Sequence, residues 1–183
     1  MDDIYVVEVV STGDSGFPKD TVAEIAVCRV LSDGSDFDSI LSSTINLDPM
    51  DLGKDSLDHL DSHHGITTSD LYMGEDQALV VRDYQNLVFG KDCTSFDVNH
   101  TFGKYLSFEP WDSTRNLTLL PPIVSRVDRS LREPTEDGRP VLCNVYEKLC
   151  PGDPAGVGKG FRALDMASMT ASIVMVLRES GFY

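Results

Sequence analysis

The sequence is poor in the features that mark several common classes of protein. No apolar run approaches the ~20 residues that a membrane-spanning helix needs. Basic residues number only 15, against 30 acidic ones. The four cysteines include no C-x-x-C pair, so we expect free thiols rather than a zinc site or a redox pair. These absences argue against a membrane protein and against metal or redox chemistry at the cysteines.

The shortage of basic residues gives a formal net charge of −15 at pH 7. Neutralisation of phosphates supplies most non-specific affinity for nucleic acid, so a chain with this charge repels nucleic acid on average. The charge disfavours a nucleic-acid coat protein, but a local patch and bound metals would still permit a nuclease. The acidic first residues also lack the basic and apolar segments of a secretory signal. We therefore expect a cytoplasmic protein with a protein partner and no membrane contact.

What the sequence does contain is a clear alternation of strand and helix patterns. A length of 183 residues suits one domain, covering residues 1–183, with a sizeable core. Apolar and β-branched runs predict strands at residues 4–10, 21–31, 38–46, 93–98 and 116–120. Helical periodicity predicts helices at residues 75–89, 100–106, 123–131, 141–149 and 163–177. Three strands followed by alternating helices and strands indicate an α/β domain with a mixed sheet.

Five short segments, in a fixed order, carry more specific information. They are VEVVSTG at residues 7–13, EIAV at 24–27, HGITTSDL at 64–71, NHTFG at 99–103 and FRALDMA at 161–167. In this order they resemble the motifs of the DnaQ-like (DEDDh) 3′–5′ exonucleases of the RNase H-like superfamily. Each match is weak by itself, but together they span residues 7–167. The resemblance implies an RNase H-like α/β fold, with a five-stranded mixed sheet, its second strand antiparallel to the others, flanked by helices.

The resemblance also implies a metal-dependent reaction whose residues are mostly missing here. The family hydrolyses phosphodiesters with two Mg²⁺ or Mn²⁺ ions about 4 Å apart, which four carboxylates hold beside a histidine general base. The positions of the four acids and the histidine correspond here to Glu8, Val10, Gly103, Met166 and Phe161. One acid of four survives and the base is gone. The motifs therefore resemble a degenerate active site.

Two carboxylates remain as candidate metal ligands, Glu8 and Asp97, which lies just before the fourth motif. A single carboxylate holds Mg²⁺ poorly. We therefore expect no cofactor, and Glu8 to be solvated or paired with Arg162 or Lys159. Mg²⁺ or Mn²⁺ is expected only if the ligands have been rearranged.

Two sets of residues are candidates for contact with nucleic acid. The first set occupies positions in the matched motifs and consists of Thr12, Asn99, Phe102 and Arg162. The second is a stripe of arginines at helical spacing, Arg126, Arg129 and Arg132. Acidic residues are interleaved with this stripe, so a solvated face of mixed charge is favoured over a phosphate-binding patch.

Three functions are compatible with these observations. The leading prediction is a catalytically inactive exonuclease homologue that acts as a regulatory, scaffolding or interaction module. The first alternative is an active 3′–5′ exonuclease on DNA or RNA with rearranged metal ligands. The second is a module that binds a nucleotide or a nucleic-acid 3′ end without cleaving it. A nuclease assay with Mg²⁺ or Mn²⁺ separates the first two, and an oligonucleotide titration at low salt detects the third.

Overall fold

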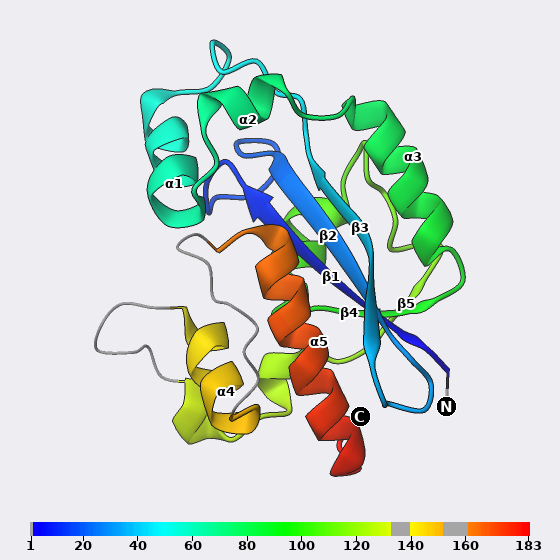
Figure 1. Cartoon of the computed structure of the whole chain (residues 1–183). Coiled ribbons are helices and arrows are strands. Elements are labelled where there is room, and N and C mark those ends of the chain that lie inside the picture. Colours follow the sequence, from blue (N-terminus) through cyan, green and yellow to red (C-terminus); the bar gives the residue numbers. More distant parts are fainter. Residues whose placement is uncertain (1, 133–139, 152–160) are drawn as a thin grey trace.

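A five-stranded mixed sheet organises the molecule (Figure 1). The structure is a computed structural model that describes residues 2–132, 140–151 and 161–183. The strand order is β3-β2-β1-β4-β5. Their bounds are Ile4–Ser11 for β1, Val22–Val30 for β2, Phe37–Thr44 for β3, Asp92–Thr94 for β4 and Thr118–Leu119 for β5. Strand β2 runs antiparallel to β1 and β3, whereas β4 and β5 run parallel to β1. The predicted sheet is thereby confirmed.

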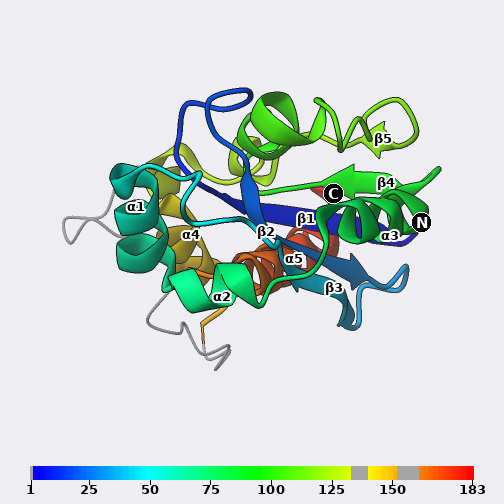
Figure 2. The same cartoon turned by 90° about the horizontal axis from the view of Figure 1, so that it is seen from above.

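Strand β1 is the middle strand of the sheet, and every one of its residues is buried. Successive side chains of a strand point to opposite faces of the sheet. On one face, Val6 and Val10 pack with α4 (Val141–Leu149) and α5 (Ala163–Glu179). On the other face, Val7 and Val9 pack with α3 (Gln77–Val88) and the π-helical segment η1 (Asn99–Leu106). Figure 1 shows α5 crossing the sheet beside α4, and Figure 2 gives the view from above.

Most predicted elements are present, with shifted ends or altered geometry. The predicted strand at 93–98 ends at Thr94, because Asp97 accepts hydrogen bonds from the backbone amides of Asn99 and His100 and so begins η1. The predicted strand at 116–120 shortens to β5. The predicted helix at 123–131 is wrong: the segment forms two 3-10 turns, Ile123–Ser125 and Arg129–Arg132. No helix in the described part of the chain is long and apolar enough to cross a membrane.

Two helices that the sequence patterns did not predict lie between β3 and α3. They are α1 (Lys54–His64) and α2 (Thr68–Tyr72). Helix α1 is dominated by charged and polar residues and buries only Leu60, so its apolar periodicity is almost absent. Gly65 ends α1 with a left-handed φ of 63°, and Thr67 begins α2 through a capping box with Asp70. The HGIT segment thus forms the junction between two helices.

Candidate functional site

The matched motifs meet at one edge of the sheet, where β1 ends, η1 begins and α5 begins. A cavity of about 240 Å³ opens between them. Four of the five positions that the motifs match to the family's acids and histidine line it: Glu8, Val10, Phe161 and Met166. Asp97, His59, His64 and His100 also line it, as do the first residues of α4. The topology therefore gathers residues that are more than 150 positions apart in the sequence.

Glu8, the remaining acid, is buried and held by hydrogen bonds from the protein. Its Oε1 accepts from the backbone N–H of Phe96 at 2.7 Å and from the Thr170 hydroxyl at 3.0 Å. Burial is the main cause that raises the pKa of Glu8 from 4.5 to about 7, and these two hydrogen bonds oppose it. The carboxyl is thus near half protonation at neutral pH. The expected pairing of Glu8 with Arg162 is wrong, and Lys159 lies outside the described residues.

Apolar side chains fill three of the other positions. Val10 is 1% exposed and belongs to the core on the α5 side of the sheet. Phe161 and Met166 are partly buried and pack against the same core. The backbone of Phe161 is also fixed to the end of α1: its carbonyl accepts from His64 Nδ1 at 2.6 Å, and its N–H donates to the His63 carbonyl at 3.4 Å. These positions now contribute packing instead of metal ligands.

The fifth position, Gly103, differs from the other four. It is exposed in η1 and does not line the cavity. A Cβ atom built there would have its nearest neighbours 4.0 Å away, at Asn99 and at the carbonyl of Val98. The acid of the family is absent here without any side chain in its place.

Asp97, just before η1, and His100 and Thr101 within it are polar residues that line the cavity. Asp97 Oδ1 caps η1 by accepting from two backbone amides, at 3.0 and 3.2 Å. Burial lowers the pKa of His100, which lies edge-on to Tyr105 with ring centroids 5.4 Å apart. Within the described ranges, no group of three or more His, Cys, Asp or Glu side chains is placed to hold a metal ion.

Three of the four motif residues predicted to contact nucleic acid have structural partners. Thr12 Oγ1 accepts from the backbone N–H of Thr21, and Phe102 lies in the core on the α3 side. Arg162 donates through Nε and Nη2 to Glu24 Oε1, at 2.9 and 2.6 Å. Asn99 is exposed at the start of η1. A contact of these residues with nucleic acid stays a prediction.

Glu24 and Arg162 join the second, third and fifth matched segments. Glu24 is buried, and its Oε2 accepts from the backbone N–H of Ala163, which satisfies a free amide at the start of α5. Its Oε1 also accepts from the Thr44 hydroxyl. Arg162 Nη1 reaches the carbonyl of Gly65 at 3.5 Å. This network fixes the start of α5 against β2, β3 and the junction between α1 and α2.

Two groups of residues that shape the cavity were not predicted from the sequence. Thr170 is four residues after Met166, so both lie on one face of α5, and this spacing was the available signal for a partner of Glu8. The residues Pro140, Val141 and Leu142 at the start of α4 bring further apolar surface to the cavity. No local signal marks them, because their position depends on how α4 packs on α5.

The arginine stripe does not form one helical face. Arg132 folds back, and its Nε and Nη2 donate to the Val127 carbonyl at 3.0 and 2.7 Å. Arg126 lines a separate cavity near Phe182. A helix would have aligned the three side chains, but the two 3-10 turns separate them.

Comparison with known proteins shows likeness in structure only. No protein-family model matches the chain, and no curated protein matches its sequence. Among solved structures, an Exonuclease I from Methylocaldum szegediense has a TM-score of 0.68 at 18% identity, and a 3′-exonuclease that recognises the histone mRNA stem-loop has a TM-score of 0.68 at 16%. E. coli Exonuclease I in complex with a dT13 oligonucleotide has a TM-score of 0.64 at 15%.

These matches cover 97–98% of this chain. The chain spans only 41% of each Exonuclease I structure, but 83% of the 3′-exonuclease that binds the stem-loop. At such low identity the likeness establishes the fold and nothing more. The chain has the DnaQ-like exonuclease fold, as the motifs implied.

Proposed function

We propose that this DnaQ-like fold is catalytically inactive and serves as a regulatory, scaffolding or interaction module. The observation that carries the proposal is the state of Glu8. Glu8 is the one carboxyl among the four acid positions of the family; it is buried, its Oε1 accepts from Phe96 and Thr170, and its pKa is about 7. It acts as a structural link between β1, α5 and the segment after β4.

The residues at the cleft do not fit a pair of Mg²⁺ or Mn²⁺ ions. Four carboxylates would balance much of the charge of two divalent ions, and hard cations need several oxygen ligands before they give up water. Here one carboxyl is near half protonation, and Val10, Phe161 and Met166 offer no oxygen from their side chains. Loss of the general base alone lowers a rate by ~10²–10⁴.

An active enzyme with rearranged ligands is the alternative that the cavity itself suggests. Asp97 lines the cavity together with Glu8, and its charge contributes to the raised pKa of Glu8. Two carboxylates that line one cavity form the beginning of a cation site. Against this alternative, Asp97 Oδ1 already caps η1.

A nuclease assay tests the proposal directly. Purified protein is incubated with single-stranded DNA and RNA labelled at the 5′ end, with Mg²⁺ or Mn²⁺, and shortening from the 3′ end is followed on gels. We expect no digestion above that of a Glu8→Gln preparation. This variant is a suitable control because glutamine keeps an oxygen acceptor for the Phe96 amide and the Thr170 hydroxyl. Asp97→Asn serves as a second comparison. Digestion that requires Mn²⁺ and disappears in Glu8→Gln overturns the proposal.

Restoring ligands gives the complementary experiment. The triple change Val10→Glu, Gly103→Asp and Met166→Asp returns the number of carboxylates at these positions to four. We expect this variant to bind Mn²⁺ in an electron paramagnetic resonance titration, whereas the unmodified protein does not. Equal Mn²⁺ binding by both proteins contradicts the proposal. Oligonucleotide binding at low salt without digestion would instead assign the cleft to 3′-end binding.

A further inference from the structure

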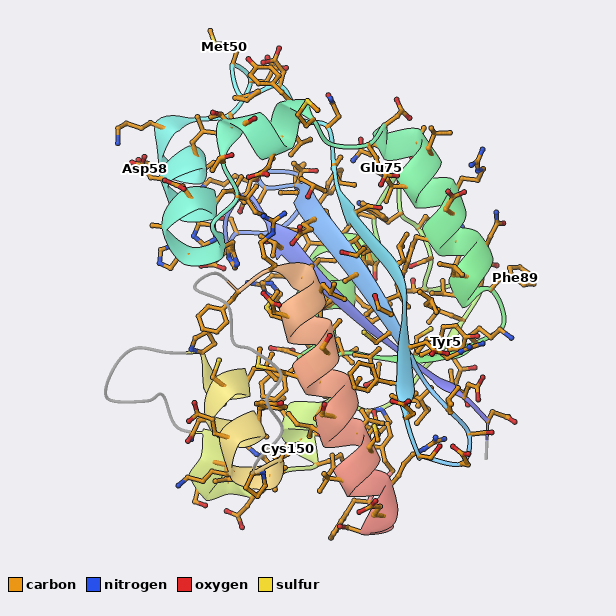
Figure 3. All side chains as sticks on the ribbon, viewed as in Figure 1. Tyr5, Met50, Asp58, Glu75, Phe89 and Cys150 are labelled. Carbon is orange, nitrogen blue, oxygen red and sulfur yellow. The ribbon has the colours of Figure 1, made fainter. Side chains whose placement is uncertain are left out.

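Three exposed apolar side chains lie on two hydrogen-bonded segments at the end of the molecule where α1 and α2 lie. They are Met50, Tyr72 and Met73, which we call the Met–Tyr patch. Met50 is 84% exposed and Met73 83%, and Tyr72 is 57% exposed. Figure 3 shows Met50 extending away from the ribbon at this end. Large apolar side chains with this exposure are candidates for contact with another molecule.

Hydrogen bonds fix the two segments that carry the patch against each other. Asn46 Nδ2 donates to the Tyr72 carbonyl at 2.9 Å, and the N–H of Leu47 donates to the Leu71 carbonyl at 3.3 Å. The N–H of Asn46 also donates to the Glu75 carbonyl at 2.8 Å. Met50 follows in a turn in which its N–H donates to Asp48 Oδ1. The backbone that carries the patch is therefore fixed by hydrogen bonds between the segment after β3 and the end of α2.

Glycine at position 74 permits this close approach. A Cβ atom at Gly74 would lie 2.5–2.7 Å from backbone atoms of Ile45 and Asn46, so a larger residue would force the two segments apart. Flexible methionine side chains on a fixed backbone suit a surface that adapts to the apolar face of a partner.

The part of the sequence that carries the patch is rich in acidic residues. Residues 46–81 contain eight acidic residues and one lysine, a net −7 of the −15 of the whole chain. The lysine, Lys54, is already paired with Asp58 on α1. Asp48, Asp51 and Glu75 are exposed close to the patch in sequence. This charge repels the phosphates of nucleic acid and of anionic lipid, and it attracts a cationic partner.

We propose that the Met–Tyr patch binds a basic amphipathic helix of a partner protein. The apolar face of that helix contacts Met50, Tyr72 and Met73, and its lysines and arginines face the surrounding carboxylates. The proposal rests on the interaction role proposed above and names the chemistry of the partner. It concerns a surface formed by α2 and the segment after β3, whereas the nuclease assay concerns the cleft.

A designed peptide tests the proposal. The probe is a fluorescein-labelled helix of about 18 residues with leucines on one face and lysines and arginines on the other, titrated with the protein in an anisotropy assay. A peptide with the same apolar face and glutamates in place of the basic residues is the charge control. We expect the basic peptide to bind at least ten times more tightly than the acidic one. We also expect its Kd to rise with added salt.

Variants and methyl resonances locate the contact. We expect Met50→Gln with Met73→Gln to weaken binding of the basic peptide at least tenfold. Phe89→Gln with Phe182→Gln also removes two exposed apolar side chains, but outside the patch, and should change the Kd less than twofold. With methyl-labelled methionine, the resonances of Met50 and Met73 should shift on binding, whereas that of buried Met169 should not.

Four outcomes overturn the proposal: binding of neither peptide, equal binding of both, binding unaffected by the methionine variants, and methyl shifts confined to the cleft. Self-association that the methionine variants abolish would also overturn it, by assigning the patch to a second copy of the chain. The two proposals fail separately, because nuclease activity would refute inactivity and leave the peptide result standing. A negative peptide titration would leave the nuclease result standing.

Discussion

Two neighbouring regions of this molecule correspond to matched motifs, yet only one of them keeps its polar residues. Arg162 and the buried Glu24 form a partly buried ion pair that holds the start of α5. Phe161, the residue directly before Arg162, is apolar where the family has a histidine. The ion pair has its partners within the chain, whereas a cluster of carboxylates needs metal ions as partners. Once metal binding is lost, the fold itself gives no reason to retain the carboxylates, since they repel one another.

The largest loss of stability that we expect comes from placing a second carboxylate beside Glu8, at a buried apolar position. Val10→Glu places a charge at a position that is 1% exposed, two residues from Glu8 on the same face of β1. We expect a loss of about 4 kcal/mol in the free energy of unfolding, measured with urea, because the charge is buried without a partner. Val10→Thr keeps the volume and should cost less than half as much. Unchanged stability of Val10→Glu would show that the position is not part of the core.

The second effect tests the region that keeps its polar residues. Arg162→Met removes the cation and leaves Glu24 buried with Thr44 and the amide of Ala163 as donors. We expect a loss of about 3 kcal/mol in the free energy of unfolding, at the lower end for a broken buried pair because Arg162 is one-third exposed.

The matched control for Arg162→Met is Arg29→Met. This change breaks the exposed pair with Asp38, and we expect it to lower the free energy of unfolding clearly less than Arg162→Met does. Equal losses from the two changes would remove the distinction between a structural network and an ordinary surface pair.

The third effect concerns the pH dependence that Glu8 gives the fold. Its pKa is 4.5 in the unfolded chain and about 7 when folded, so the folded state binds the proton more tightly. The stability linked to Glu8 is therefore complete below pH 4.5 and is lost as the pH rises to about 7. The shift corresponds to roughly 3 kcal/mol as an upper bound.

Glu8→Gln isolates this contribution, because glutamine keeps an oxygen acceptor and does not titrate. Unfolding with urea at pH 4.5, 6 and 8 should show that stability falls less with pH in the variant than in the unmodified protein. Parallel pH profiles for the two proteins would mean that the pKa of Glu8 is not raised on folding, so that the carboxyl is ionised at pH 6 and 8. That result would remove the observation on which the proposed inactivity depends.

The sequence was sufficient for the sheet and for helices α3, α4 and α5, but not for α1 or for the segment after β5. Strands β1 and β2 are predictable because every residue in β1 is buried and their apolar runs are nearly continuous. Helix α1 is not, since it buries one residue and its remaining positions are polar. The spacing of apolar residues at 123–131 predicts one helix, but the structure has two 3-10 turns there. Apolar spacing alone does not distinguish a continuous helix from two short turns.

The positions of the cleft residues follow from the motifs, whereas their partners do not. The alignment of short segments placed Val10, Phe161 and Met166 near Glu8, and the structure brings the four to one cavity. The predicted pairing of Arg162 with Glu8 was wrong, because Glu8 and Glu24 lie on adjacent strands and only the register decides which one faces the first residues of α5. Glu24 sits opposite Val10, at the end of β1 where α5 begins.

The smallest effect that we expect concerns Gly103, the one matched position that has no side chain, in contrast to the apolar side chains of Val10, Phe161 and Met166. Gly103 is exposed, and a Cβ atom there would have nothing nearer than 4.0 Å. We expect Gly103→Asp to change the free energy of unfolding by less than about 0.5 kcal/mol, and Gly103→Ala to raise it by about 0.5–1 kcal/mol, because glycine within a helix costs backbone entropy. Urea unfolding measures both. A loss above about 2 kcal/mol for either variant would mean that glycine is needed at this position for packing. If both changes are tolerated, nothing in the fold excludes an aspartate at position 103, and its absence supports the proposed loss of metal binding.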